Sequence, residues 1–248
     1  MRHLVFSVTL LMVTMTFFTC ETAGLKSGQL TIEHHDGIMN YYSLALHFAP
    51  RLYLHEDEPF EIIAIIPVFH PVKPIIAYHI FLEDDAVFAW GGKEIDHEII
   101  WIEYDPITLK VSDVATYWHR TVLRTDICLM DAKASQQRPK VFMQWGQHGI
   151  LPLGWEKLQT ARPFVELLVH YKLVTEFSRI RTEKNIDSPV TFQGSYQEYL
   201  QFTRAVDAAT YLKNQKIIVA EYPTEELKSQ VKQTFPLKKE WPFWYPTD

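Results

Sequence analysis

Short apolar segments that end at acidic or turn residues follow one another through the chain, and they constrain its fold most strongly. Residues 51–54 and 73–82 both run into acidic groups. Residues 97–104 end at an Asp-Pro pair, which is typical of turns, and residues 109–118 are expected to return beside them as a hairpin. Residues 140–145 form a further segment of this kind. The succession predicts an α+β chain whose centre is a mostly antiparallel sheet system.

Helical patterns lie on either side of these strands. Apolar residues recur at helical spacing through residues 38–49, and Pro50 ends this helix because proline disfavours helical geometry in the residue before it. Residues 163–171 show the same spacing. Ser195 followed three places later by Glu198 is a capping-box signature. We therefore expect peripheral helices, most of them in the last third of the chain.

The first 24 residues have the layout of a secretory signal peptide. Arg2 gives a positive start, an apolar run covers residues 4–18, and small residues follow. The run is short for a membrane span, although an uncleaved N-terminal anchor is the alternative. We therefore expect residues 1–24 to be removed and residues 25–248 to form a single domain that is secreted, extracellular or periplasmic.

Cysteine content and charge narrow the class further. Cys20 lies where the apolar run ends, but the residues before it are bulkier than a lipid-attachment signal favours. Cleavage beyond Cys20 leaves Cys128 as the one thiol, so no internal disulfide is expected. Hydrophobic residues make up 47% of the chain and charged residues 22%, which is ordinary for a globular protein. The net charge of -6 and the lack of a basic stripe argue against a nucleic-acid partner.

An acidic group marks the start of the strand predicted at residues 97–104. Side chains alternate along a strand, so Asp96 and Glu98 are expected on one face and His97 on the other. Two carboxylates on one face repel each other unless a cation or a proton lies between them. Asp85 ends the preceding apolar segment and can approach from the side. The group predicts a divalent cation, calcium or magnesium rather than zinc, and the alternative is a solvated acidic strand end. The candidate ligands are Asp85, Asp96, Glu98 and His97.

The residues around this group resemble a known family. Residues 78–85, followed by Asp96-His97-Glu98, are similar to the core of the necrosis-inducing-protein superfamily, which includes secreted cytolysins and a vacuolar-sorting-related group. In the cytolysins a strand ends in an aspartate, and a Gly-His-Arg-His-Asp-Trp-Glu segment then leads into an apolar strand. Lys93 stands where the first histidine of that segment is expected, and His97 replaces its tryptophan. By this comparison one metal ligand is missing, unless His97, His148 or water replaces it.

Two further segments follow the order of this family. Ala49-Pro50 precedes a Leu-rich strand with acidic residues after it, and a His-Gly pair at residues 148–149 is followed by Pro152. The resemblance covers roughly residues 49–155. It implies a β-sandwich core that binds a cation through side-chain oxygens in an acidic cleft. It also implies recognition of a glycan or a lipid head group, which allows association with a membrane surface.

His148 is the candidate for catalysis. As a functional residue it would line the cleft as a ligand or proton donor, and as a structural residue it would hydrogen-bond in a turn before Gly149. The sequence has no Gly-x-Ser-x-Gly, phosphate-binding glycine loop or His-Glu-x-x-His motif. Three functions therefore stay open: a secreted cation-dependent recognition domain, which is preferred, a metal-dependent hydrolase that uses His148, and a structural exoprotein without a metal.

Overall fold

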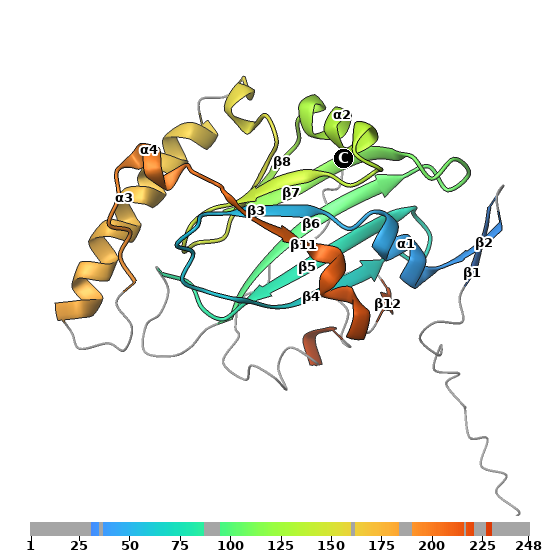
Figure 1. Ribbon diagram of the computed structural model, residues 1–248, viewed down its shortest axis with the longest axis horizontal. Coiled ribbons are helices and arrows are strands. Elements are labelled where there is room, and N and C mark those ends of the chain that lie inside the picture. The colour runs from blue at the N-terminus through green and yellow to red at the C-terminus, as the bar shows by residue number, and fades with distance from the viewer. Residues whose placement is uncertain are drawn as a thin grey trace, which may run out of the picture.

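Two β-sheets form the centre of the chain (Figure 1). The structure is a computed structural model that describes residues 31–34, 37–86, 95–159, 162–183, 190–215, 217–220 and 227–229. A four-stranded sheet has the order β10 (Ile150–Pro152), β9 (Lys140–Met143), β3 (Arg51–Leu54) and β11 (Arg204–Asp207). A six-stranded sheet has the order β12 (Ile218–Val219), β4 (Ile62–Phe69), β5 (Ile75–Leu82), β6 (Asp96–Tyr104), β7 (Val111–Trp118) and β8 (Thr121–Leu123). A separate antiparallel pair joins β1 (Thr31–His34) and β2 (Gly37–Asn40).

The predicted α+β class with a mainly antiparallel sandwich core is confirmed. Strand pairs in the two sheets are antiparallel except for β3 with β9 and β4 with β12. Leu52 and Val141 of the four-stranded sheet share one buried cluster with Ile80 and Ile100 of the six-stranded sheet, and none of the four has exposed surface. Burial of such side chains contributes about 1.5–3 kcal/mol each, so this cluster stabilises the packing of the two sheets against each other.

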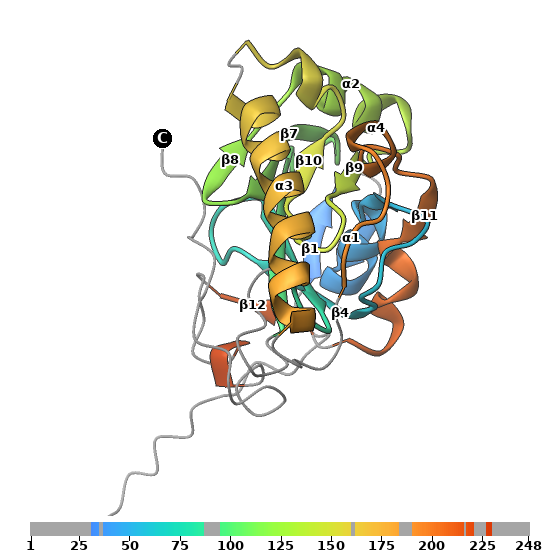
Figure 2. The same ribbon diagram turned by 90° about the vertical axis from the view of Figure 1, so that its left-hand side faces the viewer.

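The helices lie around the sheets (Figures 1 and 2). They are α1 (Tyr41–His47), α2 (Asp126–Ala134), α3 (Arg162–Glu183) and α4 (Tyr196–Tyr199), with short 3-10 turns η1 (Trp155–Lys157), η2 (Ala208–Thr210) and η3 (Leu212–Asn214). α3 crosses one end of the two sheets, as Figures 1 and 2 both show. None of the helices in the described ranges combines the length and the apolar character that a membrane span requires.

Local capping explains where three of these helices begin. The Asn40 side chain accepts a hydrogen bond from the Ser43 amide at 2.8 Å, so α1 starts after Asn40 rather than at residue 38. Thr125 caps α2 in the same way. The capping box predicted from Ser195 and Glu198 is present at α4 and is confirmed.

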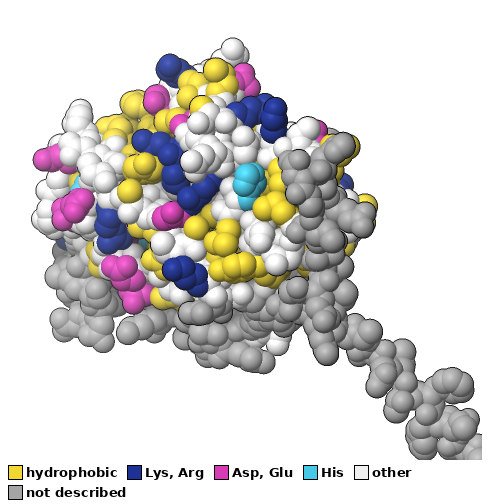
Figure 3. Space-filling view, turned by 45° about the vertical axis from the view of Figure 1, so that its right-hand side comes forward, with side chains coloured by type: hydrophobic (Ala, Val, Ile, Leu, Met, Phe, Trp, Pro, Cys, Tyr) yellow, Lys and Arg dark blue, Asp and Glu magenta, His cyan; other side chains and the backbone are white. Residues whose placement is uncertain are grey.

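The predicted signal peptide at residues 1–24 and the position of Lys93 lie outside the described residues. Figure 3 shows one face of the molecule, on which basic and acidic side chains alternate with hydrophobic ones. On that face we see no broad field of a single charge among the described residues.

Candidate functional site

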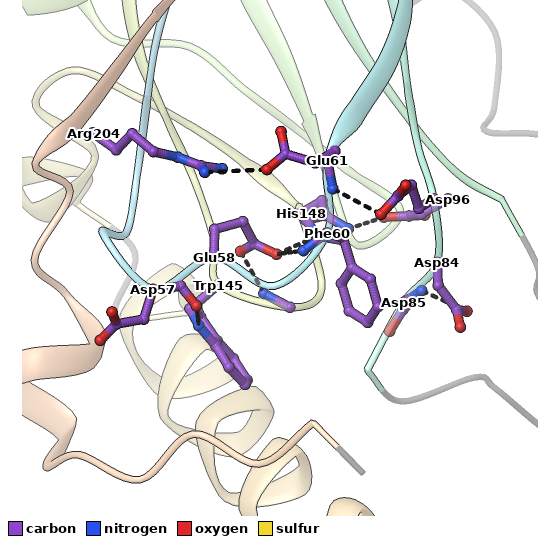
Figure 4. Close-up of polar contacts among 12 residues, drawn as sticks. Asp57, Glu58, Phe60, Glu61, Asp84, Asp85, Asp96, Trp145, His148 and Arg204 are labelled. Carbon is purple, nitrogen blue, oxygen red and sulfur yellow. Dashed lines mark hydrogen bonds and ion pairs between the residues drawn. The ribbon is translucent and has the colours of Figure 1, made fainter. Parts of the chain in front are cut away.

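Three segments meet at a buried histidine held between two carboxylates (Figure 4). Nδ1 of His148 lies 2.7 Å from Oδ2 of Asp96, which is the first residue of β6. Nε2 of His148 lies 3.0 Å from Oε1 of Glu58, in the loop between β3 and β4. The side chains of His148 and Glu58 are fully buried, and that of Asp96 is 17% exposed. We call Glu58, Asp96 and His148 the buried triad.

Each ring nitrogen of His148 lies within hydrogen-bond distance of a carboxylate oxygen, and because an ionised carboxylate can only accept, this arrangement fits an imidazolium that donates from both nitrogens. Burial by itself lowers the pKa of His148, but the charges and hydrogen bonds of Glu58 and Asp96 outweigh it and raise the pKa well above 6.5. The ring therefore keeps its charge at neutral pH. A buried ion pair of this kind costs desolvation energy and is tolerated only when its remaining polar atoms are also bonded.

Glu58 meets that condition through the backbone around it. Its Oε1 also accepts a hydrogen bond from the Phe60 amide at 3.1 Å, and its Oε2 accepts one from the Gly146 amide at 2.9 Å. The triad thus joins the β3–β4 loop, the start of β6 and the turn between β9 and β10. These contacts connect residues that lie 52 and 90 positions apart in the sequence.

A tight turn presents His148 to the carboxylates. The His148 amide donates to the Gln144 carbonyl at 2.9 Å, and the Gln144 amide donates to the Gly149 carbonyl at 3.1 Å. His148 has φ +58, a left-handed backbone conformation in which histidine is several-fold enriched among non-glycine residues. The structural role considered for His148, a hydrogen-bonded position before Gly149, is therefore present.

Replacing Gly149 by alanine is expected to destabilise this turn. A Cβ at this position would lie 2.5 Å from Cδ1 of Trp118 and 2.8 Å from Nε2 of His119, both of which belong to packed rings. Overpacking of this kind typically costs about 1–3 kcal/mol. Urea unfolding of Gly149→Ala beside the wild type measures this cost, and a loss below about 0.5 kcal/mol would contradict the close approach.

The structure separates the four predicted metal ligands. The register of β5 with β6 pairs Leu82 with Asp96 and Ile80 with Glu98, so both carboxylates start on one face, as predicted, and this is the inter-sheet face. His97 lies on the opposite face. Its ring stacks on Phe81 at 4.3 Å between ring centroids, and its Nε2 lies 2.8 Å from Nδ1 of His79.

Asp85 is buried in the loop after β5. The amide of the next residue, Ala86, donates to the Gly146 carbonyl at 2.7 Å, which holds this loop close to the turn that carries His148. Of the predicted site residues, the structure thus brings Asp96 and His148 into direct contact.

This donor set does not fit the divalent cation that the resemblance implies. Oδ2 of Asp96 is bonded to His148, and an imidazolium has no free lone pair for a metal. His97 lies on the other face of β6 from Asp96 and Glu98, as the alternation along the strand predicts, and its Nε2 faces His79 instead. Within the described ranges, no three or more His, Cys, Asp or Glu side chains are grouped so that they could hold a metal.

A second polar network lies beside the triad and fixes α3. Oε1 of Gln144 accepts hydrogen bonds from Nε1 of Trp118 at 3.1 Å and from Nε2 of His119 at 2.6 Å. Nε2 of Gln144 donates to the Tyr199 hydroxyl at 2.6 Å. The His119 ring stacks on His170 of α3 at 3.7 Å between centroids. His119 is thus held by a hydrogen bond and by ring stacking, and burial lowers its pKa to about 3.

An open cleft of about 550 Å³ lies next to the triad. One wall is the acidic loop His55–Asp57 with Pro59, and the other comes from residues 190–194 and polar side chains near α4. Trp145 and Phe192 also line it, with their ring centroids 5.1 Å apart. The cleft thus combines aromatic and polar lining, as ligand sites commonly do.

Carboxylates give the cleft its charge. Glu56, Asp57 and Glu198 line it, and no Lys or Arg does so among the residues that the structure describes. Oε2 of Glu56 accepts a hydrogen bond from the Thr203 hydroxyl at 3.2 Å, and Glu198 caps α4. Figure 4 shows the Asp57 carboxylate pointing away from His148. The cleft therefore offers hydrogen-bond acceptors at its acidic wall.

The triad supports the wall of this cleft. Nε1 of Trp145 donates to the Asp57 carbonyl at 2.9 Å, and the next amide, that of Gly146, donates to Glu58. Figure 4 shows Glu58 and His148 between Asp96 on one side and Asp57 with Trp145 on the other. Disturbing the triad is thus expected to move two neighbouring positions that line the cleft.

The sequence patterns did not point to Glu58 or to the cleft wall at residues 190–194. Glu58 is the last of three consecutive acidic residues, Glu56-Asp57-Glu58. The only local sign that it differs from the other two is the Pro59-Phe60 pair that follows it. The apolar Phe60, whose ring lies 5.6 Å from that of His148, anchors this loop inside. No motif marks residues 190–194.

Comparison with known proteins gave no match, either to a family model, to a curated protein or to a solved structure.

Proposed function

We propose that this chain is a recognition domain that binds a glycan in the cleft beside Asp57, outside the cytoplasm. The observation that carries the proposal is the cleft itself, which has the size of a small-ligand site, an aromatic part and several polar side chains. The export layout of residues 1–24 supports a place of action outside the cytoplasm.

The chemistry of the lining favours a neutral polyhydroxylated ligand. Hydroxyl groups donate to carboxylates such as Asp57, while Gln193 and Gln201 both donate and accept hydrogen bonds. A phosphate, as in most lipid head groups, would face three carboxylates with no Lys or Arg among the described lining residues. Of the two ligand classes that the resemblance implies, the cleft therefore favours the glycan.

The hydrolase alternative has less support. His148 was its acid–base candidate, but this ring is fully buried in the triad and is not among the residues that line the cleft. A general acid or base must come within hydrogen-bond reach of the substrate. Recognition without bond cleavage requires only the cleft that is present.

A blocking substitution tests the proposal. Gln201→Trp adds a bulky ring to an exposed position of the cleft wall, and Met130→Trp adds the same ring to α2, where Met130 is 69% exposed. On a glycan array we expect the wild type and Met130→Trp to bind the same glycans. Gln201→Trp is expected to lose at least about tenfold in affinity, equal to about 1.4 kcal/mol, with an unchanged melting temperature.

Two results would contradict this function. One is that no array glycan binds the wild-type protein. The other is that Gln201→Trp keeps full affinity for every glycan that the wild type binds, which would place recognition away from the cleft.

A further inference from the structure

Two carboxyl groups, those of Glu58 and Asp96, lie at an almost dry end of the sandwich. The Glu58 side chain has no exposed surface, and that of Asp96 has 17%. An ionised carboxylate in such surroundings needs a nearby positive charge, because burial alone would drive it toward the neutral form. Such a charge comes from a bound cation or from a side chain of the chain itself.

The two ring nitrogens of His148 place this side chain against both carboxylates. Asp96 accepts from Nδ1 at 2.7 Å and Glu58 accepts from Nε2 at 3.0 Å, which leaves the ring without a lone pair for a metal. We infer that the imidazolium of His148 is the internal counter-ion of these two carboxylates, and that this end of the fold is held together without a bound metal ion.

The neighbouring histidines do not offer a substitute for the ring. Nε2 of His119 already donates to Gln144 at 2.6 Å. The His79–His97 pair, whose ring nitrogens are 2.8 Å apart, lies across the sheet from the inter-sheet face that Asp96 occupies. Among the contacts of the described residues, those of His148 reach both carboxylates.

With an internal counter-ion, the folded state of the domain does not require a bound metal ion. A domain held by a metal unfolds when its metal is removed, because metal-binding energy is then part of the folding energy. A domain held by its own histidine keeps its shape in metal-poor or chelating surroundings. Because Glu58 also bonds the Gly146 amide beside the cleft, the cleft would share this independence.

Two measurements on the full mature chain test the inference. The first is metal content by mass spectrometry, with melting curves in EDTA and in millimolar calcium, magnesium, manganese or zinc. We expect less than about a tenth of an equivalent of any metal and melting shifts below about 1 °C, since a saturating ligand of the folded state shifts melting by several degrees. About one equivalent of metal, or a fall of more than about 5 °C in EDTA, would overturn the inference.

The second measurement asks whether the ring acts through its charge. His148→Asn removes the charge and keeps a residue that tolerates φ +58. In the triple variant that adds Glu58→Gln and Asp96→Asn, no carboxylate is left to balance. We expect the triple variant to recover at least about half of the decrease in melting temperature that His148→Asn causes. Neutralising every member of a buried charged cluster costs less than removing one partner and leaving the others unpaired.

A triple variant no more stable than His148→Asn would overturn the inference, because the ring would then act by packing alone. If His148→Asn does not fold, a cooperative melting transition in the triple variant counts as the expected recovery. Absence of a transition in both variants counts against the inference.

Discussion

Replacing His148 by asparagine is expected to lower the free energy of unfolding by about 3–5 kcal/mol, which is a large part of the stability of a typical domain. The substitution leaves the carboxylates of Glu58 and Asp96 buried without their common partner. Asparagine tolerates the left-handed backbone at this position, so backbone strain contributes little to the loss. Urea unfolding followed by far-ultraviolet circular dichroism measures the change.

His47→Asn is the matched control for this substitution. The His47 ring is half-buried at the end of α1 and lies 3.4 Å from the Leu109 carbonyl oxygen, with no carboxylate partner among the described residues. We expect this control to lose less than about 1 kcal/mol. Equal losses in the two variants would show that His148 contributes no more than an ordinary half-buried ring.

Lowering the pH is expected to destabilise the protein already at pH values well above those at which carboxylates titrate. Burial lowers the pKa of His79 and of His119 to about 3, whereas both groups titrate near 6.5 in the unfolded chain. Between these values the unfolded state binds protons that the folded state does not, so stability falls as the pH falls from about 6.5 toward 3. Each of the two histidines lowers the free energy of unfolding by about 1.4 kcal/mol per pH unit in this range. Together they lower it by roughly 2.7 kcal/mol per pH unit.

His148 acts in the opposite direction. Its folded pKa is raised, so its contribution to stability is complete below about 6.5 and is lost as the pH rises through the raised value. Stability is therefore expected to be greatest near neutral pH. Urea unfolding at intervals from pH 4 to pH 9 gives the profile.

His119→Asn separates the contribution of one ring to the acid side of this profile. His119 has φ +42, which asparagine tolerates, and the variant removes one titrating group. The slope between about pH 4 and 5.5 is expected to fall by about 1.4 kcal/mol per pH unit. An unchanged slope would mean that His119 is already protonated in the folded protein.

The strands with local signals were predictable, and β4 was not. The segments that became β5, β6 and β7 are apolar, rich in β-formers and bounded by turns, and the structure places them as neighbours. β4 contains Pro67, which argues against a central strand. The structure accommodates it because, among the described residues, β12 pairs with Val68 and Phe69 and does not reach Pro67.

The candidate site was predictable only in part, for a related reason. Asp96 and His148 both stood out, since one begins an acidic strand and the other precedes a glycine in a turn. Their contact with each other and with Glu58 depends on how distant loops pack, and spacing along the chain carries no sign of it. The cleft joins still more distant parts, because His55 bonds the carbonyl of Glu198, 143 positions away.

The parallel pairing of β3 with β9 bears on the order in which the chain can assemble. Strands β4 to β8 pair with their neighbours in sequence, so each can dock as soon as it is synthesised. β3 comes before them, yet its two neighbours are β9 and β11, which place Arg51 beside Lys140 and Asp207. During synthesis one edge of β3 therefore stays unpaired until β9 emerges, and the other stays unpaired until β11 emerges in the last third of the chain. Open edges invite pairing with other chains, so this interval is when a nascent molecule is most exposed to aggregation.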